Sequence, residues 1–285
     1  MLAVLMSTYN GSKYVKDQIE SIINQTYQDL ELFIRDDGSS DDTYSIINKY
    51  AELYPNKVHI CKDELKNIGF IKSFLQLIKC VDADYYAFSD QDDVFFPEKY
   101  TLIMEVLSKY NDLKQNEPLG IICNAEVTDE NLIPLGVKMY DKALGLDFQK
   151  CVGNFIYGRN HLFCPFGCSI TFNHAVKNFI YKNSNLVIPD RTLSMFFHDA
   201  LIWFICIING KFIFLDEDLQ YYRQHTNNTH GFHPLKKLSK MEYTINIIKK
   251  FKMVYNRNFG CYYHVGFKVP VFKLLINKLI FILFH

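Results

Sequence analysis

The stretch FSDQDDVFFPEK, residues 88–99, is the most informative part of this sequence. Its first two residues are the end of an apolar run, residues 85–89, whose length and composition predict a buried strand. Side chains two residues apart in an extended segment point to the same side, so Asp90 and Asp92 would share one side. Two carboxylates at a strand end are typical of a site for Mg²⁺ or Mn²⁺, with substrate phosphates as further ligands. An acidic loop without a metal is the alternative.

An apolar run followed by a polar cluster occurs twice more, earlier in the chain. STYN, residues 7–10, follows the apolar run 2–6, and DDGS, residues 36–39, follows the run 30–34. The carboxyl ends of parallel strands meet at one edge of an open sheet, so we expect the three clusters to surround one crevice. Each cluster taken alone is also explained as a turn or a helix cap.

Helical patterns alternate with the apolar runs through the first half of the chain. Two further strands are expected at residues 58–61 and 119–123. Helices are expected at residues 15–23, at 41–53 with Ser40 or Asp41 as the cap, at 71–81 and at 97–110. This alternation predicts an α/β fold with a mostly parallel, Rossmann-like sheet flanked by helices.

The first polar cluster lacks the glycine pattern of the common nucleotide folds. Neither G-x-G-x-x-G nor a Walker A motif is present, which argues against dinucleotide-dependent oxidoreductases and P-loop enzymes. Asp36 and Asp37 suit neutral donors such as a base N–H or ribose hydroxyls, because carboxylates repel phosphates unless a metal intervenes.

The regular alternation stops after residue 125. Residues 128–168 are rich in turn residues and predict an irregular region with short strands. Beyond them we expect helices at 173–181 and 198–208, a strand at 211–215, a basic helix at 236–257 and an apolar segment at 267–284.

Composition places the chain among globular proteins with an uneven charge distribution. Of 285 residues, 49% are hydrophobic and 22% are charged, which excludes disorder as the main state. Residues 219–285 carry a net charge of +10 and residues 1–218 a net charge of −10. A basic surface that meets an anionic membrane or nucleic acid is one interpretation, and a solvated basic helix is the other.

Cysteine usage and the start of the chain suggest a cytoplasmic protein. None of the eight cysteines falls in a C-x-x-C pair, and several lie in apolar runs, so we expect reduced thiols. A strand pattern that begins at Leu2 leaves no room for a signal peptide, and no apolar stretch is long enough to span a membrane.

Three runs together resemble one enzyme family. LMSTYNGSKYVKDQIESIINQTYQDLELFIRDDGSSDDT (5–43), NIGFIKSF (67–74) and FSDQDDVFFPEK (88–99) are similar to family 2 glycosyltransferases of the GT-A fold. The likeness is greatest to rhamnosyltransferase-like members that build bacterial surface polysaccharides, and it covers about residues 2–232. It implies a GT-A domain at 1–232, with a nucleotide-binding half (1–125) and an acceptor-binding half (126–232). A basic and apolar helical extension, 233–285, would follow.

The resemblance also implies an activity and its partners. It implies transfer of a sugar from a nucleotide-sugar donor, dTDP-rhamnose or a UDP-hexose, to a glycan or lipid-linked glycan acceptor. It implies a divalent metal, Mg²⁺ or Mn²⁺, and inversion at the anomeric carbon. The basic and apolar end of the chain would suit peripheral contact with the inner face of the plasma membrane; packing on the domain or on a partner chain is the alternative. No nucleic-acid partner is expected.

Residue roles follow from the same resemblance. Asp92 would lie nearest the metal, and Asp90 would contact the metal or the ribose. Phe95 and Phe96 stand where similar proteins often have a tryptophan, which we expect to alter packing rather than chemistry. The nucleotide-sugar would further contact Thr8, Tyr9, Asp37, Asn67 and Gly69.

Later segments supply the remaining candidate residues. Asp199 is the candidate catalytic base, with a helix cap as its alternative role and His198 as the alternative base. Gly167 and Cys168 match a loop beneath the sugar, to which His198 is also assigned.

The run QYYRQHTNN, residues 220–228, resembles a segment that closes over the diphosphate. Arg223 would donate to phosphate oxygens, and His225 would complete the metal site or donate to the diphosphate. A surface loop is the alternative. The spacing of His225, His230 and His233 fits no standard zinc site.

Two other functions remain open at this point. One is a catalytically inactive module that binds nucleotide or glycan, against which the intact DQDD run and Asp199 argue. The other is a nucleotidyltransferase on a similar sheet, which would need a glycine-rich and basic loop where residues 9–12 read YNGS.

Overall fold

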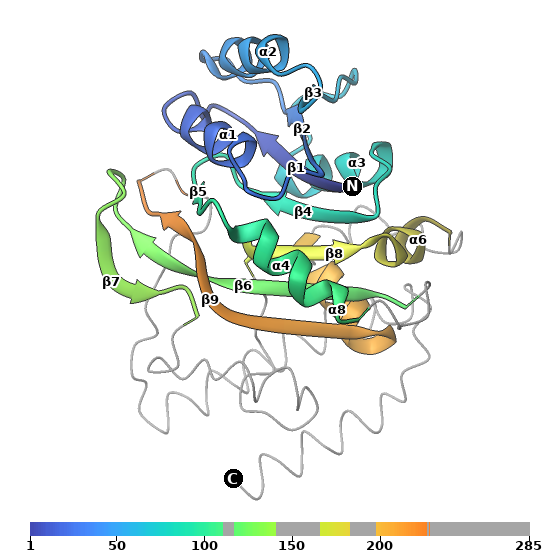
Figure 1. The fold of residues 1–285 in the computed structure, drawn as a ribbon. Helices are drawn as coiled ribbons and strands as arrows, with labels where there is room; N and C mark the ends of the chain where they lie inside the picture. Colours follow the sequence, from blue (N-terminus) through green and yellow to red (C-terminus); the bar gives the residue numbers. More distant parts are fainter. Residues whose placement is uncertain (111–116, 141–165, 183–197, 227, 229–285) are drawn as a thin grey trace, which may run out of the picture.

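The computed structural model describes residues 1–110, 117–140, 166–182, 198–226 and 228 (Figure 1). The predictions for residues 236–257 and 267–284, and so for the extension 233–285, lie outside the described residues. The apolar runs of the first half form strands and the amphipathic segments form helices, as predicted.

A single nine-stranded sheet forms the centre of the described chain. Its order is β3-β2-β1-β4-β8-β6-β9-β5, with β7 paired to β6. The pairing places β1 to β4, β6 and β9 in one direction and β5, β7 and β8 in the opposite direction. The strands are β1 (Leu2–Thr8), β2 (Leu30–Asp36), β3 (Val58–Ile60), β4 (Tyr85–Ser89), β5 (Val94–Phe95), β6 (Leu119–Thr128), β7 (Pro134–Lys138), β8 (Ile170–Asn173) and β9 (Lys211–Arg223).

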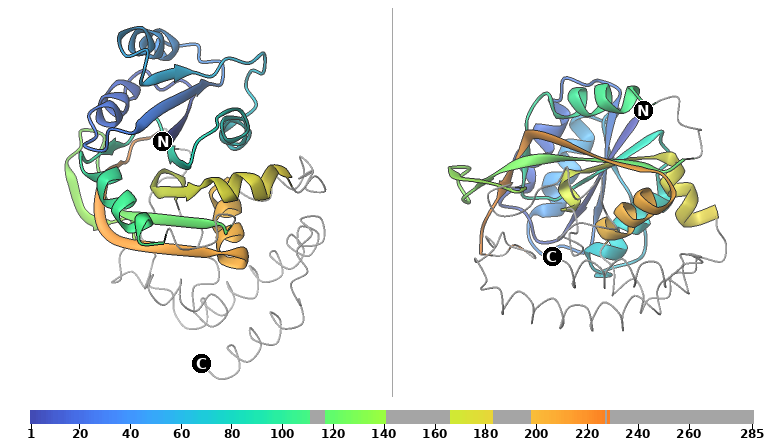
Figure 2. Two further views of the ribbon diagram at one scale, coloured as in Figure 1. Left: turned by 45° about the vertical axis from the view of Figure 1, so that its right-hand side comes forward. Right: turned by 90° about the horizontal axis from the view of Figure 1, so that it is seen from below.

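Helices cover both faces of this sheet, and β1 shows why. Ala3 and Leu5 belong to one core cluster with the apolar sides of α3, α6 and α8, whereas Leu2, Val4 and Met6 join α1, α2 and α4 in a second cluster. Alternation along a strand therefore supplies both cores. Figure 2 shows α4 and α8 on opposite sides of the sheet. The helices are α1 (Val15–Ile23), α2 (Thr43–Leu53), α3 (Phe70–Cys80), α4 (Lys99–Ser108), α6 (His174–Lys182) and α8 (His198–Asn209), with a 3-10 turn η2 (Gly167–Ser169).

Several boundaries differ from the predictions for local reasons. β9 continues eight residues past the predicted end at 215, because pairing with β6 resumes at Asp218 after an irregularity in the register at the partly exposed acidic segment 216–218. β5 has only two residues, too few for a periodic pattern. The N-cap of α2 is Asp42 rather than Ser40 or Asp41, although the Asp41 carboxylate accepts a hydrogen bond from the Thr43 N–H at 3.0 Å.

The five cysteines within the described residues, Cys61, Cys80, Cys123, Cys168 and Cys206, are free thiols. Within the same residues, every helix is too short or too polar to cross a bilayer.

Candidate functional site

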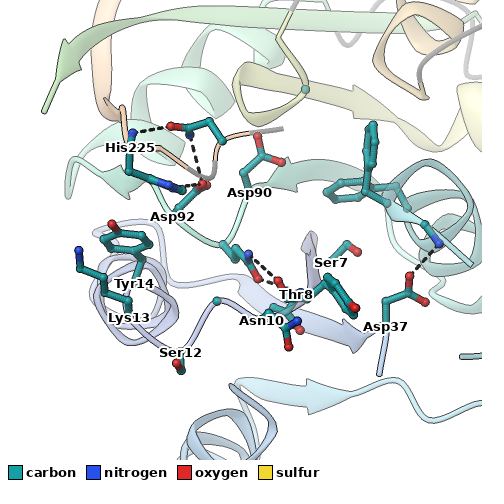
Figure 3. A pocket seen from close by; sticks show the side chains of 18 of the residues that line it. Ser7, Thr8, Asn10, Ser12, Lys13, Tyr14, Asp37, Asp90, Asp92 and His225 are labelled. Carbon is teal, nitrogen blue, oxygen red and sulfur yellow. Dashed lines mark hydrogen bonds and ion pairs between the residues drawn. The ribbon is translucent and has the colours of Figure 1, made fainter. Parts of the chain in front are cut away.

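A cavity of about 810 Å³ lies at the carboxyl ends of β1, β2 and β4 (Figure 3). The three polar clusters predicted to share one sheet edge meet there, joined by the first turn of α8. Most of the predicted site residues line it: Thr8, Tyr9, Asp37, Asn67, Gly69, Asp90, Asp92, Gly167, His198, Asp199 and His225. Figure 3 shows Asp37 at one end, Asp92 with His225 at the other, and Asp90 between them.

Asp37 organises the first end of the cavity. Its carboxylate accepts hydrogen bonds from the backbone N–H groups of Ile68 at 2.9 Å and Gly69 at 2.7 Å, which fastens the loop before α3 to the end of β2. Gly69 has φ 82° and ψ 154°, a conformation essentially restricted to glycine. Asp37 therefore shapes this loop, in addition to its predicted contact with the nucleoside.

The buried Arg35 supports Asp37 from below. Its guanidinium donates to Asp37 at 2.8 Å, to Ser73 of α3 at 2.6 Å and to Asp63 at 2.8 Å. The hydrogen bond from the Arg35 guanidinium lowers the pKa of the Asp63 carboxyl group. Sequence reasoning missed Arg35, although an arginine at the end of an apolar strand and two residues before an aspartate was a usable signal.

Asp92 and His225 form the opposite end. The Asp92 carboxylate lies 2.8 Å from Nε2 of His225 and accepts a weaker bond from the Asn228 amide at 3.4 Å. His225 comes from the segment after β9, so residues 133 positions apart meet here. The structure thus brings these two candidate metal ligands into direct contact.

Asp90 lies between the two ends in an unfavourable electrostatic setting. Burial, together with the nearby charges of Asp92 and Asp199, raises its pKa to about 7, while Lys99 opposes the shift. A positive charge bound at this position would stabilise the ionised carboxylate.

A second cluster lies deeper, behind Asp90. Ligand atoms of Asp90, Asp93 and Cys168 approach within 4.8 Å of one another. However, Asp93 already accepts the Arg223 backbone N–H at 3.2 Å, and burial raises the pKa of the Cys168 thiol well above its usual value. A protonated thiol is a poor ligand for a hard cation, so we interpret this cluster as a hydrogen-bond network.

Lys99 completes that network and was missed by the sequence reasoning. Its ammonium is buried, donates to the Cys168 carbonyl at 3.1 Å and to the Gln220 amide, and lies 3.4 Å from the centre of the Phe95 ring. Nothing in the sequence marks a lysine in an amphipathic helix as buried, because lysine is normally exposed.

The oxygen and imidazole donors that line the open cavity fit a divalent cation. Asp92 and His225 are in direct contact, and burial together with the neighbouring carboxylates raises the pKa of Asp90, so a bound cation would stabilise its ionised form. Asp90, Asp92 and His225 would hold Mg²⁺ or Mn²⁺, both of which accept such donors.

Two of the predicted site residues, Cys168 and Arg223, are not among the described residues that line the cavity. The Cys168 side chain is buried, with its sulfur 3.2 Å from the Gln220 amide nitrogen. Arg223 donates to the Asp17 carboxylate at 2.9 Å and to the Glu130 carbonyl at 3.2 Å. Its guanidinium is therefore engaged at the start of α1 rather than at a phosphate position.

Gln91 joins two of the cavity-lining loops. Its amide accepts the Tyr9 backbone N–H at 2.9 Å and donates to the Tyr9 carbonyl at 3.1 Å. A side chain at Gly11 would overlap this amide, at 2.3 Å from its oxygen. The sequence reasoning gave Gln91 no role, since a residue between two aspartates carries no chemical signal of its own.

His198 and Asp199 begin α8 and have different environments. His198 is buried, and the pKa of its imidazole is lowered to about 3 because burial removes the solvation of the charged form. Such an imidazole is a weak base, which disfavours His198 as the alternative catalytic base. Asp199 is half-buried in the cavity wall, and its carboxylate accepts the Ala200 N–H at 2.6 Å.

Sequence comparison identifies similar proteins. The profile of the family described as Glycosyl transferase family 2 matches residues 3–115, which confirms the family resemblance over that part of the chain. The dTDP-rhamnosyl transferase RfbG of Shigella flexneri is 41% identical over 97 residues, 33% of this chain and 34% of that protein. An uncharacterized glycosyltransferase of Nostoc sp. is 27% identical over 80% of this chain and 66% of its own length. The chain thus spans between one third and two thirds of these relatives.

Solved structures share the fold at low sequence identity. TarS of S. aureus, residues 1–349 in complex with UDP-GlcNAc, has a TM-score of 0.53 at 15% identity, over 89% of this chain and 66% of that one. The mannosyltransferase PcManGT of Pyrobaculum calidifontis, in complex with GDP-Man and Mn²⁺, has a TM-score of 0.58 at 14% identity, over 97% and 68%. The predicted GT-A fold is confirmed.

Proposed function

We propose, on the premise that residues 3–115 of this chain belong to glycosyl transferase family 2, that the protein transfers a sugar from a nucleotide-sugar donor to a glycan or lipid-linked glycan. The name of the Shigella relative favours dTDP-rhamnose as donor, and the UDP-GlcNAc bound to TarS makes a UDP-hexose the second candidate. The acceptor class follows from the resemblance to enzymes of surface-polysaccharide synthesis.

One observation carries the proposal: Asp37, Asp92 and Asp199 surround a single cavity. They come from the end of β2, the end of β4 and the start of α8, so only folding brings them together. A nucleoside beside Asp37 and Tyr9 and a diphosphate toward Asp92 and His225 would span the length of the cavity.

Asp199 is the proposed general base. It accepts the proton of the acceptor hydroxyl as that oxygen attacks the anomeric carbon, while the bond from this carbon to the diphosphate oxygen breaks. Attack opposite the leaving group inverts the configuration. A positioned base of this kind contributes about 10²- to 10⁴-fold to the rate.

The remaining residues bind and orient the donor. Thr8, Tyr9, Asn67 and Gly69 line the nucleoside end, and Gly167 allows close approach of the sugar because it has no side chain. A divalent cation held by Asp90, Asp92 and His225 would supply positive charge to the departing diphosphate.

A thermal-shift panel of UDP-, dTDP- and GDP-sugars with Mn²⁺ tests donor binding. A donor that binds the folded state raises the melting temperature by mass action, and dTDP-rhamnose or a UDP-hexose should give the largest rise. The absence of a shift with every donor would contradict the proposed function.

Replacing the base separates chemistry from binding. Asp199→Asn is expected to lower turnover at least about 100-fold, because an amide cannot accept the proton. The donor-induced thermal shift should stay unchanged. Glu217→Gln, at an exposed position on β9, is the matched control and should keep full turnover. Near-normal turnover of the Asp199 variant would show that another group is the base.

A further inference from the structure

Tyr14, the residue before α1, makes a contact that the proposed function does not yet use. Its ring lies flat against the His225 imidazole, with 4.5 Å between ring centres and 28° between the planes. Tyr14 is 8% exposed and lines the same cavity as Asp92. The imidazole is therefore held between the Asp92 carboxylate on one side and an aromatic ring on another.

The Tyr14 ring is itself fixed from several directions. The Arg223 guanidinium lies 4.7 Å from its centre and is anchored by Asp17 of α1 at 2.9 Å. The Tyr14 hydroxyl lies 3.4 Å from the Glu130 carboxylate, which Lys13 binds at 2.8 Å. Arg223 thus contacts two residues that line the cavity, the Tyr14 ring and the Glu130 carbonyl, which gives its side chain a supporting role.

A rigid support matters at this position because His225 lies beyond the last residue of β9. The last backbone hydrogen bond to β6 runs from the Gln224 N–H to the Thr128 carbonyl at 2.9 Å, one residue before His225, so the sheet alone does not orient the imidazole. Groups that orient a metal-binding histidine contribute to metal affinity, because the ligand then needs no ordering when the metal binds.

We propose that Tyr14 is a positioning residue that holds His225 beside Asp92 and thereby sets the affinity of the cavity for a divalent cation. This inference rests on the proposed function, in which His225 is a metal ligand. Tyr14 acts through His225 and contacts no reacting atom.

The test is a titration of the full chain with Mn²⁺ in saturating dTDP and, separately, in saturating UDP, in which electron paramagnetic resonance measures free Mn²⁺. Tyr14→Leu should weaken Mn²⁺ binding about tenfold. Tyr14→Phe keeps the aromatic ring, and its affinity for Mn²⁺ should stay within about twofold of the wild-type affinity. Tyr14→Met provides a second comparison if the leucine variant does not fold.

A double substitution shows whether Tyr14 acts through His225. The double variant Tyr14→Leu/His225→Ala should lose as much Mn²⁺ affinity as His225→Ala alone. The effects of the two substitutions should not add, because Tyr14 acts through His225. Wild-type affinity in Tyr14→Leu, or full additivity with His225→Ala, would overturn the inference. If the wild type binds no Mn²⁺ with either dTDP or UDP, the metal assignment of the proposed function fails instead.

Discussion

His198 is a histidine buried among aromatic rings at the start of α8. Its imidazole stacks on Phe74, with 4.3 Å between ring centres, and meets the edge of Phe88 at 4.8 Å. Within the described chain both ring nitrogens lack a hydrogen-bond partner. A buried polar atom without a partner is destabilising, and an apolar group of the same shape removes that penalty.

The pKa of His198 makes a prediction about stability and pH. The folded value is about 3, below the ordinary value of 6.5, so between these values the unfolded chain binds the proton and the folded chain does not. Stability should therefore fall as the pH decreases from 6.5 toward 3. His198→Phe should match or exceed wild-type stability at pH 7, by up to about 1 kcal/mol, and should lose part of the acid dependence.

Urea denaturation of both proteins at pH 7 and pH 5 measures this difference. The comparison between the two proteins isolates His198, because carboxylates with raised pKa values, such as Asp90, contribute equally to both. An identical loss of stability in wild type and variant between the two pH values would rule out a buried, neutral His198.

At the scale of elements, the cavity depends on contacts between loops that no single strand or helix provides. Gln91, in the loop after β4, holds the loop after β1 through two bonds to the Tyr9 backbone. Asp37, after β2, holds the loop before α3 in the same way. The loops around the cavity are thus held by side chains that bond to backbone groups beyond the strand ends.

The contact between Gly11 and Gln91 predicts a non-additive pair. A methyl group at Gly11 would displace the Gln91 amide, which would then lose both bonds to Tyr9. Gly11→Ala and Gln91→Ala should each weaken binding of the nucleoside diphosphate several-fold, and the double variant should be no weaker than either. Calorimetric titration of the three variants measures this, and losses that add in full would exclude the shared contact.

At the scale of the whole molecule, charge separates the two ends of the chain. Residues 219–285 carry a net charge of +10, and the remainder carries −10. If the acceptor is lipid-linked, the basic end would hold the enzyme at an anionic bilayer, since each lysine near such a surface contributes about 1 kcal/mol.

Vesicle co-sedimentation tests this expectation. The full chain should sediment with anionic vesicles and not with zwitterionic ones, and binding should weaken with salt because salt screens the charges. Glutamine at six basic positions should abolish the difference: Lys236, Lys237, Lys240, Lys249, Lys250 and Lys252. Equal sedimentation of this variant and the wild type would remove the membrane from the proposal.

The sequence by itself determined the alternation of strands and helices and the residues at the ends of β1, β2 and β4. Apolar periodicity reports whether a segment is buried, and polar residues after a strand report where it ends. These local signals mark the carboxyl ends of parallel strands, which meet at one edge of a sheet. They therefore predicted that Asp37, Asp90 and Asp92 would share that edge. They did not predict the two-residue β5 or the full length of β9, which depend on pairing with distant strands.

Only the tertiary structure decided which side chains enter the cavity. Arg223 follows the expected motif, yet its side chain lies on α1, and Cys168 is enclosed behind Asp90. The burial of Lys99 against Cys168, the Tyr9 contacts of Gln91 and the stacking of Tyr14 on His225 join residues 69, 82 and 211 positions apart, which no local pattern connects. The physical reason is that a side chain's partners depend on packing in three dimensions, whereas a sequence pattern reports only its neighbours along the chain.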